Sequence, residues 1–264
     1  MELQLHGKHA LVTGSTGGIG LAIAKALARE GAQVILNGRS GERVLRAAEE
    51  IRAEFPDAIL NDFVGDLSQA DQVDALAAAF PHVDILVNNL GVYSVKAFEE
   101  ITDEDWHAII ETNFMSGLRL SRHYLPRMKK SGWGRILFIS SESADNIPVE
   151  MIHYGVTKTM QVALARGLAE TTRGTAVTVN SILPGPTRSE GVAAFVKDLA
   201  KSRNVPLEVV EKEFFQNARP SSLLQRFASV DEIASLVAYV ASPLSSATNG
   251  AALRVEGGLL RSIL

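Results

Sequence analysis

Short hydrophobic runs alternate along the chain with longer stretches in which hydrophobic residues recur at helical spacing. Residues 9–13 form the first run, a helical pattern follows over 18–29, and a second run lies at 34–36. This alternation predicts βαβ units and a parallel sheet. Further strands are predicted at 59–64, 84–87, 135–139, 177–182 and 252–255, and further helices at 44–53, 73–80, 105–128, 153–170 and 231–240.

These elements predict an α/β fold of the Rossmann type, in which helices on both faces cover a doubly wound sheet of seven parallel strands. Strands buried on both faces are nearly continuous hydrophobic runs, and residues 85–87 and 136–139 have that character. Gly31 is predicted to end the first helix. Because the composition marks no linker and no internal repeat, residues 1–264 are predicted to form one domain.

The segment from Pro184 to Gln225 interrupts the pattern. It carries Phe195, Phe214 and Phe215 among many charged residues, and it is too long for an ordinary connection and too amphipathic for disorder. Loops of this size in compact domains are usually functional lids or disordered segments. Two interpretations stay open for residues 186–225, a mobile lid over a substrate and a pair of surface helices with structural aromatic residues.

Composition narrows the classes of function. The formal net charge of −4 and the pI near 5.9 provide no broad basic surface, so we expect no nucleic-acid partner and favour a small or carrier-borne substrate. The absence of cysteine excludes disulfides, thiolate metal sites and a cysteine nucleophile, and no metal site is predicted.

Two further features concern location. The first residues lack the charged-then-hydrophobic order of a secretory signal, which favours a cytoplasmic protein. The uncharged stretch 234–253 contains Pro243, Asn249 and Gly250, so it is predicted to be a helix end, a loop and a strand rather than a membrane span.

A glycine-rich turn follows the first predicted strand and opens the first predicted helix. Its sequence is Thr13-Gly14-Ser15-Thr16-Gly17-Gly18-Ile19-Gly20. Glycine permits a tight turn and a close approach of the backbone to a pyrophosphate, while the N–H groups of the helix N-terminus face the phosphates. In this context the turn predicts a dinucleotide site, although its glycine spacing differs from the usual G-x-G-x-x-G.

The end of the second predicted strand bears on which dinucleotide is bound. A carboxylate there would hydrogen-bond a ribose 2′-hydroxyl, but residues 36–40 read Leu-Asn-Gly-Arg-Ser. The guanidinium of Arg39 could instead hold a 2′-phosphate, so NADP(H) is favoured and NAD(H) is the alternative. Arg39 could also simply begin a solvated helix, like Arg43 and Arg46. Asp66 and Leu67 could lie near the adenine, with Asp66 as an N-cap the other interpretation.

Tyr154 and Lys158 are four positions apart in a helical pattern, so their side chains project from one face. An ordinary tyrosine, with a pKa near 10, is a poor acid or base at neutral pH. Lowering its pKa by roughly three units requires about 4 kcal/mol, which a close cation in a desolvated site can supply. Alone, the pair could equally be a solvated helix face with a buried ring.

Taken together, these motifs resemble those of the short-chain dehydrogenase/reductase family. The matching positions are Thr13, Gly14, Gly18, Gly20, Asn88, Asn89, Leu90, Gly91, Asn113, Ser141, Tyr154, Lys158, Pro184 and Gly185. The match extends over nearly the whole chain, and the spacing of Asn113, Ser141 and Tyr154 follows the family pattern.

The resemblance implies catalytic roles for four residues. Tyr154 would exchange a proton with the substrate oxygen while hydride moves to or from the nicotinamide, and Ser141 would hydrogen-bond that oxygen. Ser140 competes for this role, but strand alternation directs it the other way. Lys158 would hold the nicotinamide ribose and lower the pKa of Tyr154, and Asn113 would support a water-linked proton relay.

The resemblance also implies a set of cofactor-binding positions. They are Gly14, Ser15, Thr16, Gly18, Ile19, Gly20, Arg39, Asp66, Leu67, Asn88, Gly91, Tyr154, Lys158, Pro184, Gly185 and Thr187. Three features depart from the family pattern: Leu90 replaces a usual small residue, no basic residue occupies position 15 or 16, and Glu142 places a charge directly after Ser141.

The implied activity is that of a carbonyl reductase or alcohol dehydrogenase that resembles the 3-oxoacyl thioester reductases. One alternative is a nicotinamide-binding regulator or scaffold without turnover, and another is dehydration or epimerisation in the same cleft. The resemblance further implies a homotetramer, or a homodimer, paired through the helices at 105–128 and 153–170.

Overall fold

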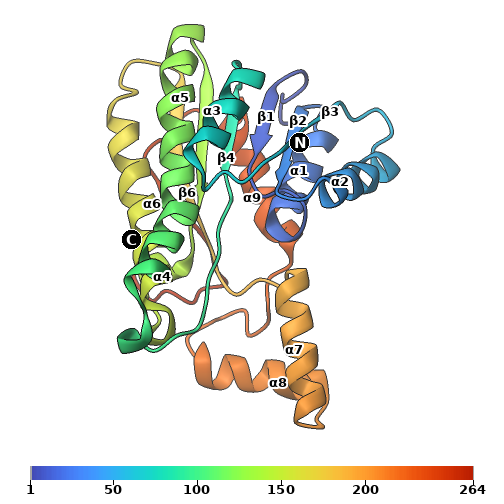
Figure 1. Ribbon diagram of the computed structural model, residues 1–264, viewed down its shortest axis with the longest axis vertical. Coiled ribbons are helices and arrows are strands. Elements are labelled where there is room, and N and C mark those ends of the chain that lie inside the picture. The colour runs from blue at the N-terminus through green and yellow to red at the C-terminus, as the bar shows by residue number, and fades with distance from the viewer. Residues whose placement is uncertain (1, 264) are drawn as a thin grey trace.

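A single parallel sheet forms the centre of the molecule (Figure 1). The computed structural model describes residues 2–263, apart from the side chain of Phe195. Its seven strands are β1 (His9–Val12), β2 (Gln33–Gly38), β3 (Leu60–Val64), β4 (Ile85–Asn88), β5 (Gly134–Ile139), β6 (Val177–Pro184) and β7 (Ala252–Val255). They lie in the order β3-β2-β1-β4-β5-β6-β7, and every pair is parallel. The predicted seven-stranded Rossmann fold is confirmed.

Helices cover both faces because strand side chains alternate. Ala10 and Val12 belong to the core under α1, α2 and α9, whereas Leu11 belongs to the core under α3, α5 and α6. The helix bounds are α1 Gly18–Arg29, α2 Gly41–Glu54, α3 Ala70–Ala79, α4 Asp103–Ile110, α5 Ser116–Ser131, α6 Ile152–Glu170, α7 Glu190–Ser202, α8 Leu207–Glu213 and α9 Val230–Ala241. The predicted elements therefore lie within a few residues of the observed ones, and Gly31, with φ +83°, follows the end of α1 in the left-handed region.

One predicted helix differs from the observed structure. The pattern at 105–128 corresponds to α4, a π-helical turn over Glu111–Met115, and α5. A π-helical turn is one wide turn with helix on both sides of it, so a hydrophobic pattern taken over the whole stretch does not resolve it.

The segment after β6 forms two helices, α7 and α8, and a second π-helical turn over Phe214–Ala218. It has a small hydrophobic core of its own, made of Val196, Ala200, Val210, Phe215 and Phe227. Figure 1 shows α7 and α8 projecting beyond the end of the sheet at which the strands finish. The interpretation as helices with structural aromatic residues describes this architecture, and the mobility of the segment stays a prediction.

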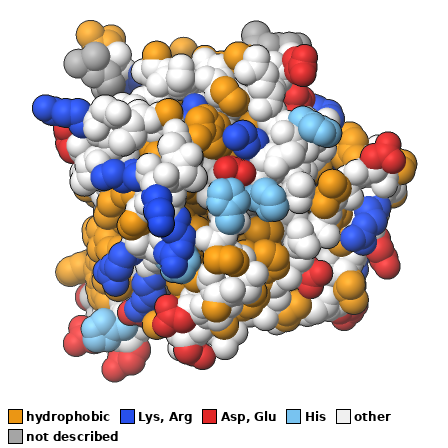
Figure 2. Space-filling view, turned by 90° about the horizontal axis from the view of Figure 1, so that it is seen from above, with side chains coloured by type: hydrophobic (Ala, Val, Ile, Leu, Met, Phe, Trp, Pro, Cys, Tyr) orange, Lys and Arg blue, Asp and Glu red, His pale blue; other side chains and the backbone are white. Residues whose placement is uncertain are grey.

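The end of the molecule opposite α7 and α8 is seen in Figure 2. Figure 2 shows Lys and Arg side chains gathered over one side of it, with hydrophobic, acidic and histidine side chains interspersed over the rest.

The stretch 234–253 comprises the end of α9, a loop and β7, as predicted. Within residues 2–263, no helix is both long and apolar enough to cross a membrane.

Candidate active site

The candidate site lies at the carboxyl ends of the strands, where β1 and β4 are neighbours. The chain reaches the sheet edge at β3 and returns to the middle at β4, and such a reversal opens a crevice between the two loops that follow β1 and β4. Thr13 joins these loops because its Oγ1 accepts hydrogen bonds from the backbone N–H groups of Asn89 and Leu90, both at 2.9 Å.

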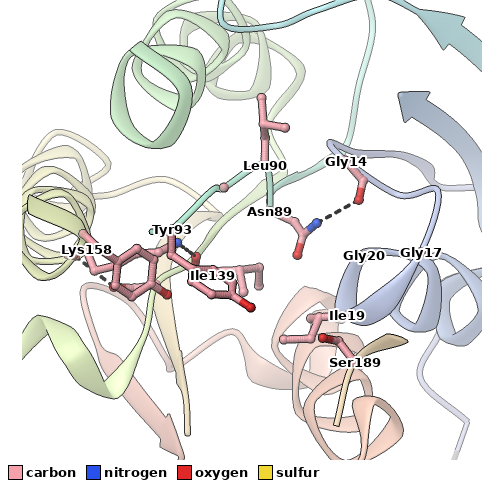
Figure 3. Close-up of a pocket in the computed structure, with 13 residues that line it drawn as sticks. Gly14, Gly17, Ile19, Gly20, Asn89, Leu90, Tyr93, Ile139, Lys158 and Ser189 are labelled. Atoms are coloured by element: carbon pink, nitrogen blue, oxygen red, sulfur yellow. Dashed lines mark hydrogen bonds between the residues drawn. The ribbon is translucent and has the colours of Figure 1, made fainter. Parts of the chain in front are cut away.

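Asn89 strengthens this connection. Its Nδ2 donates to the carbonyl oxygens of Thr13 at 2.9 Å and Gly14 at 3.1 Å, and Figure 3 shows the side chain reaching across to Gly14. Asn88, predicted to line the cleft, instead points toward α5, where its Nδ2 donates to Ser121 Oγ at 3.4 Å. The reason is alternation, since Asn88 ends β4 on the same face as Leu86.

The glycine-rich turn requires glycine at two positions in particular. Gly14 has a φ of +62°, a conformation that side chains disfavour. A Cβ on Gly20 would lie 2.4 Å from the carbonyl oxygen of Gly14, closer than any real contact. No side chain caps the N-terminus of α1, so the N–H groups of its first turn are available to an anion.

A cleft of about 270 Å³, here the glycine cleft, begins at this turn. Figure 3 shows Gly14, Gly17 and Gly20 at one end, and Lys158 and Tyr93 at the other. Its lining residues are Gly14, Gly17, Ile19, Gly20, Asn89, Leu90, Gly91, Tyr93, Ile139, Ser140, Tyr154, Lys158 and Ser189.

A second cavity of about 270 Å³, here the arginine pocket, adjoins the glycine cleft and shares Gly14 and Leu90 with it. Its lining residues are Gly14, Thr16, Asn37, Gly38, Arg39, Ser40, Arg43, Gly65, Asp66, Leu67 and Leu90. Arg39 is 74% exposed and its Nη1 lies 4.0 Å from Asp66 Oδ2. The N-cap of α3 is Gln69 rather than Asp66, whose Oδ1 instead accepts from the backbone N–H of Ser68 at 3.0 Å.

Arg43 also reaches the arginine pocket, although the sequence pattern placed it with solvated residues. It lies in the first turn of α2, and its Nη2 is close to Gly17, where it would be 3.4 Å from an added Cβ. Arg46, one turn further on, pairs with Glu42 at 2.6 Å and does not line the pocket. The signal for Arg43 in the sequence was its position soon after the second strand, in the first turn of the helix that follows.

Lys158 is buried, with 4% of its surface exposed. Its Nζ donates to the carbonyl oxygen of Ile139 at 2.9 Å and lies 3.4 Å from Gln161 Oε1. Among the described residues, no carboxylate forms an ion pair with this ammonium. Burial therefore lowers the pKa of Lys158 to about 7.

Tyr154 lies beside Lys158, whose Nζ is 5.5 Å from the centroid of the phenol ring. Burial raises the pKa of the phenol above its ordinary value; a hydrogen bond with Ser141 opposes this, and the Glu142 carboxylate adds to it. Desolvation has the largest influence on the pKa of Tyr154, and Lys158 is not among the groups that shift it here, so the role of Lys158 in lowering this pKa stays a prediction.

A third cavity of about 380 Å³, here the apolar pocket, lies on the other side of Tyr154. Its lining residues are Tyr93, Val95, Ser141, Glu142, Ser143, Glu150, Met151, Tyr154, Gly185, Pro186, Thr187, Val192, Val196, Phe214, Arg219 and Phe227. Tyr93 and Tyr154 line both this pocket and the glycine cleft. The phenol of Tyr154 therefore stands between two cavities.

Ser141 and Ser140 point in opposite directions, as alternation predicts. Ser141 lines the apolar pocket, and its Oγ donates to Glu142 Oε2 at 2.6 Å. Ser140 Oγ donates to the carbonyl oxygen of Lys158 at 2.9 Å. Only Ser141 faces the cavity on the far side of Tyr154 from Lys158.

Asn113 lies in the π-helical turn between α4 and α5. Its Oδ1 accepts from the backbone N–H of Val92 at 2.8 Å, and its Nδ2 donates to the Val92 carbonyl at 2.9 Å and to Thr157 Oγ1 at 3.1 Å. These contacts connect the loop after β4 to α6. Asn113 Oδ1 and Lys158 Nζ both lie close to Gly91, but no hydrogen bond joins them within the described residues.

Several predicted cofactor positions have other surroundings. Ser15 is buried, and its Oγ accepts from the backbone N–H of Asn37 at 2.9 Å, so it connects the turn to β2 rather than facing the cleft. Gly18 faces a shallow cavity beside Arg188, on the other side of the turn. Gly185 and Thr187 line the apolar pocket instead of the glycine cleft, while Pro184, the last residue of β6, lines neither.

Comparison with known proteins identifies the family. A model of the family described as short chain dehydrogenase matches residues 8–200. The chain belongs to this family. It is 47% identical over 263 residues to the uncharacterized oxidoreductase YvaG of Bacillus subtilis (strain 168), which covers 100% of both chains.

Other short-chain dehydrogenases match over a similar extent. The 3-oxoacyl-(acyl-carrier-protein) reductase FabG of Aquifex aeolicus (strain VF5) is 32% identical over 262 residues, covering 98% of this chain and 100% of that protein. The crystal structure of L-sorbose reductase from Gluconobacter frateurii, complexed with NADPH and L-sorbose, matches 100% of both chains with a TM-score of 0.93 and 30% identity. The resemblance stated from the motifs is confirmed, and the chain is an oxidoreductase of the short-chain dehydrogenase type.

Proposed function

We propose that this short-chain dehydrogenase is an NADP(H)-dependent oxidoreductase that interconverts a carbonyl compound and a secondary alcohol. The observation that carries this proposal is the position of Tyr154 in the wall between two cavities. Lys158 lies on the side of the glycine cleft, and Ser141 lies on the side of the apolar pocket. A side chain that exchanges a proton with the substrate oxygen while the cofactor exchanges hydride must lie where the cofactor site meets the substrate site.

The residues present fit a dinucleotide phosphate. The uncapped N-terminus of α1, with no room for a Cβ at Gly20, would hold the pyrophosphate. Arg39 and Arg43 would hold the 2′-phosphate in the arginine pocket, and the glycine cleft would extend to the nicotinamide at Lys158. The cofactor supplies or accepts the hydride. The NADPH in the similar L-sorbose reductase structure supports this choice, and NAD(H) is the alternative.

The protein supplies the proton. Because the pKa of Tyr154 is raised, its phenol stays protonated at neutral pH and can donate to the carbonyl oxygen during reduction. The alcohol direction requires the phenolate, so its rate should rise with pH above neutrality while the reduction rate stays level. Ser141 would hydrogen-bond the same oxygen from the apolar pocket.

A Tyr154→Phe variant tests this function. Reduction of a panel of ketones and aldehydes, followed by nicotinamide absorbance, should slow by about a hundredfold to ten-thousandfold, because the proton donor is lost. Cofactor affinity should change little. Tyr239→Phe, at a 40% exposed position on α9, is the matched control and should keep full activity.

Three outcomes distinguish the alternatives. Unchanged turnover in Tyr154→Phe would remove the proposed mechanism. Cofactor binding by the wild-type protein without turnover of any carbonyl or alcohol would favour the regulator or scaffold. Tighter binding of NADH than of NADPH would reassign the cofactor.

We further propose that the protein is cytoplasmic and assembles as a homotetramer through α4, α5 and α6, which lie together along one side of the molecule in Figure 1. The family resemblance supports this assembly, with a homodimer as the smaller alternative. Light scattering on the purified protein measures the mass, and a monomer would contradict the proposal.

A further inference from the structure

The carboxylate of Glu142 faces the apolar pocket directly beside Ser141. Glu142 begins the 3₁₀ turn Glu142–Ala144 after β5, and only 4% of its surface is exposed. Its Oε2 accepts hydrogen bonds from Ser141 Oγ at 2.6 Å and Ser143 Oγ at 2.8 Å. A buried carboxylate in contact with a proposed catalytic serine requires an explanation, since charges are rarely buried without a purpose or a partner.

The partner is Arg219, which comes from the segment after the second π-helical turn. Arg219 Nε donates to Glu142 Oε1 at 3.2 Å, and the guanidinium lies 5.9 Å from the centroid of the Phe214 ring. The side chain of Arg219 is 12% exposed. Glu142 and Arg219 therefore form a desolvated pair whose charges cancel inside the pocket.

The remaining charge near the pocket is exposed. Glu150 Oε1 lies 3.8 Å from Arg219 Nη1, but its side chain is 43% exposed and water screens it. The pocket interior therefore has no free positive charge among the described residues, because the one guanidinium that lines it faces two carboxylates. A substrate carboxylate placed there would meet Glu142 without a cation to neutralise it.

The Glu142 carboxylate also has one further position at which it can accept a hydrogen bond. A carboxylate offers about four acceptor positions and no donor. Ser141 and Ser143 occupy Oε2, and Arg219 occupies one position on Oε1. The remaining position can accept an O–H or N–H group from a molecule that fills the pocket.

The neighbouring walls restrict where that donor lies. Val95, Met151, Val192, Val196, Phe214 and Phe227 contribute only apolar side chains to the pocket. Ser141 Oγ and Glu142 Oε2 lie 2.6 Å apart, close to the separation of two oxygens on neighbouring carbon atoms. When the Ser141 hydroxyl turns from Glu142 to a substrate carbonyl oxygen, Glu142 Oε2 loses that donor and can accept a hydroxyl on the next carbon of the same molecule.

We propose that the substrate is a neutral hydroxyketone, or the corresponding diol, whose second hydroxyl lies on the carbon next to the reacting carbon and donates to Glu142. Arg219 is a positioning residue that neutralises Glu142 and holds its carboxylate toward Ser141. This inference rests on the proposed function, because it assumes that Ser141 holds the reacting oxygen. It disfavours oxo acids, and it disfavours acyl thioesters without an adjacent hydroxyl.

Three small ketones test this substrate class with NADPH as the cofactor. Acetoin carries the adjacent hydroxyl, butanone is the same molecule without it, and acetoacetate carries a carboxylate. For the wild-type protein, kcat/KM should be about tenfold or more higher for acetoin than for butanone, because a hydrogen bond to a charged group is at stake. It should be lowest for acetoacetate.

The Glu142→Gln variant separates recognition from a structural role. A general loss of stability or of serine position slows all three substrates alike, whereas loss of the charged acceptor lowers the acetoin-to-butanone ratio severalfold. The freed Arg219 should also raise the relative rate with acetoacetate. Glu208→Gln, at an exposed position on α8 that lines none of the three cavities, is the control and should leave the ratio unchanged.

Binding provides a second measurement that does not depend on turnover. Acetoin should raise the melting temperature of the NADPH-loaded protein more than butanone does, and Glu142→Gln should abolish the difference. If Glu142→Gln does not fold, Arg219→Lys, which keeps the charge but loses the Nε contact, should lower the same ratio.

The outcomes separate this inference from the proposed function. Turnover of ketones without a preference for acetoin, or with a preference that Glu142→Gln leaves intact, overturns the assignment of substrate while the oxidoreductase stands. Absence of all turnover refutes the proposed function, and the melting temperatures then decide the binding claim. A greater rate with acetoacetate than with acetoin in the wild-type protein also overturns the inference.

Discussion

The buried charges on the two sides of Tyr154 have different partners. On the side of the glycine cleft, the ammonium of Lys158 contacts a carbonyl and an amide oxygen but no carboxylate among the described residues. On the side of the apolar pocket, the carboxylate of Glu142 is held by a guanidinium and two hydroxyls. One buried charge is uncompensated and the other is neutralised.

This difference indicates which kind of ligand each cavity can accommodate. An uncompensated cation is costly to bury, and a ligand that brings hydroxyl oxygens and negative charge reduces that cost. A neutralised pair attracts no net charge and instead selects by hydrogen bonding. The glycine cleft is therefore suited to an anionic dinucleotide, and the apolar pocket to a neutral molecule.

The largest effect should come from removing the uncompensated charge. In the unfolded chain Lys158 stays protonated up to about pH 10.5, whereas in the folded protein it loses its proton above about pH 7. The unfolded state binds more protons between these values, so wild-type stability should rise with pH there, by about 1.4 kcal/mol for each pH unit. Below pH 7 the full cost of burial is present and does not change.

A Lys158→Met variant should lack this dependence. It should be more stable than the wild type at pH 7, and the difference should shrink toward pH 10.5. Denaturant unfolding without cofactor, repeated along the pH range, measures this. Lys197→Met, at an exposed position on α7, is the control. Parallel stability curves for wild type and Lys158→Met would show that the ammonium is not desolvated.

A smaller effect should follow from crowding the glycine-rich turn. In Gly20→Ala the new Cβ would press on the carbonyl oxygen of Gly14 and on Asn89, and neither can withdraw cheaply because Asn89 also holds Thr13. Overpacking of this kind costs about 1–3 kcal/mol, so NADPH affinity should fall by about tenfold to a hundredfold.

Gly191 is the matched control for this change, since a Cβ there meets nothing within 4 Å on α7. Isothermal titration of NADPH into both variants compares the two regions directly. Equal affinities for Gly20→Ala and Gly191→Ala would mean that the turn does not hold the cofactor.

The smallest effect concerns the choice of cofactor. Arg39→Asp should shift preference from NADPH toward NADH by about tenfold, because an exposed guanidinium contributes at the low end of charged hydrogen bonds. Arg46→Asp, on α2 and outside the arginine pocket, should not shift it. The ratio of the two dissociation constants is the measurement, and an unchanged ratio would leave Arg43 as the residue to examine.

Much of the site was accessible from the sequence because its motifs are local. Tyr154 and Lys158 share one helix, and the glycine-rich turn is a single short segment. The family resemblance indicated Ser141, and strand alternation set Ser140 aside. Hydrophobic spacing likewise placed most strands and helices within a few residues.

The errors occur where a side chain's surroundings depend on distant parts of the chain. The resemblance implied that Asn88 lines the cleft, but Asn88 is still part of β4 and its side chain points toward α5, while the next residue, Asn89, lines the cleft. Arg43 was grouped with solvated residues, because only the folded chain brings its guanidinium close to Gly17. The π-helical turn at Asn113 is one wide turn with helix on both sides, and the hydrophobic pattern of the whole stretch did not resolve it.

The alternation of strands and helices and the residues that follow each strand could be predicted from the sequence, since both depend on neighbours along the chain. Folding was needed to show that Tyr154 separates two cavities and that Glu142 pairs with Arg219, 77 residues away. The physical reason is that burial and charge compensation arise from groups that meet only after the chain has folded, and no local pattern specifies which groups those are.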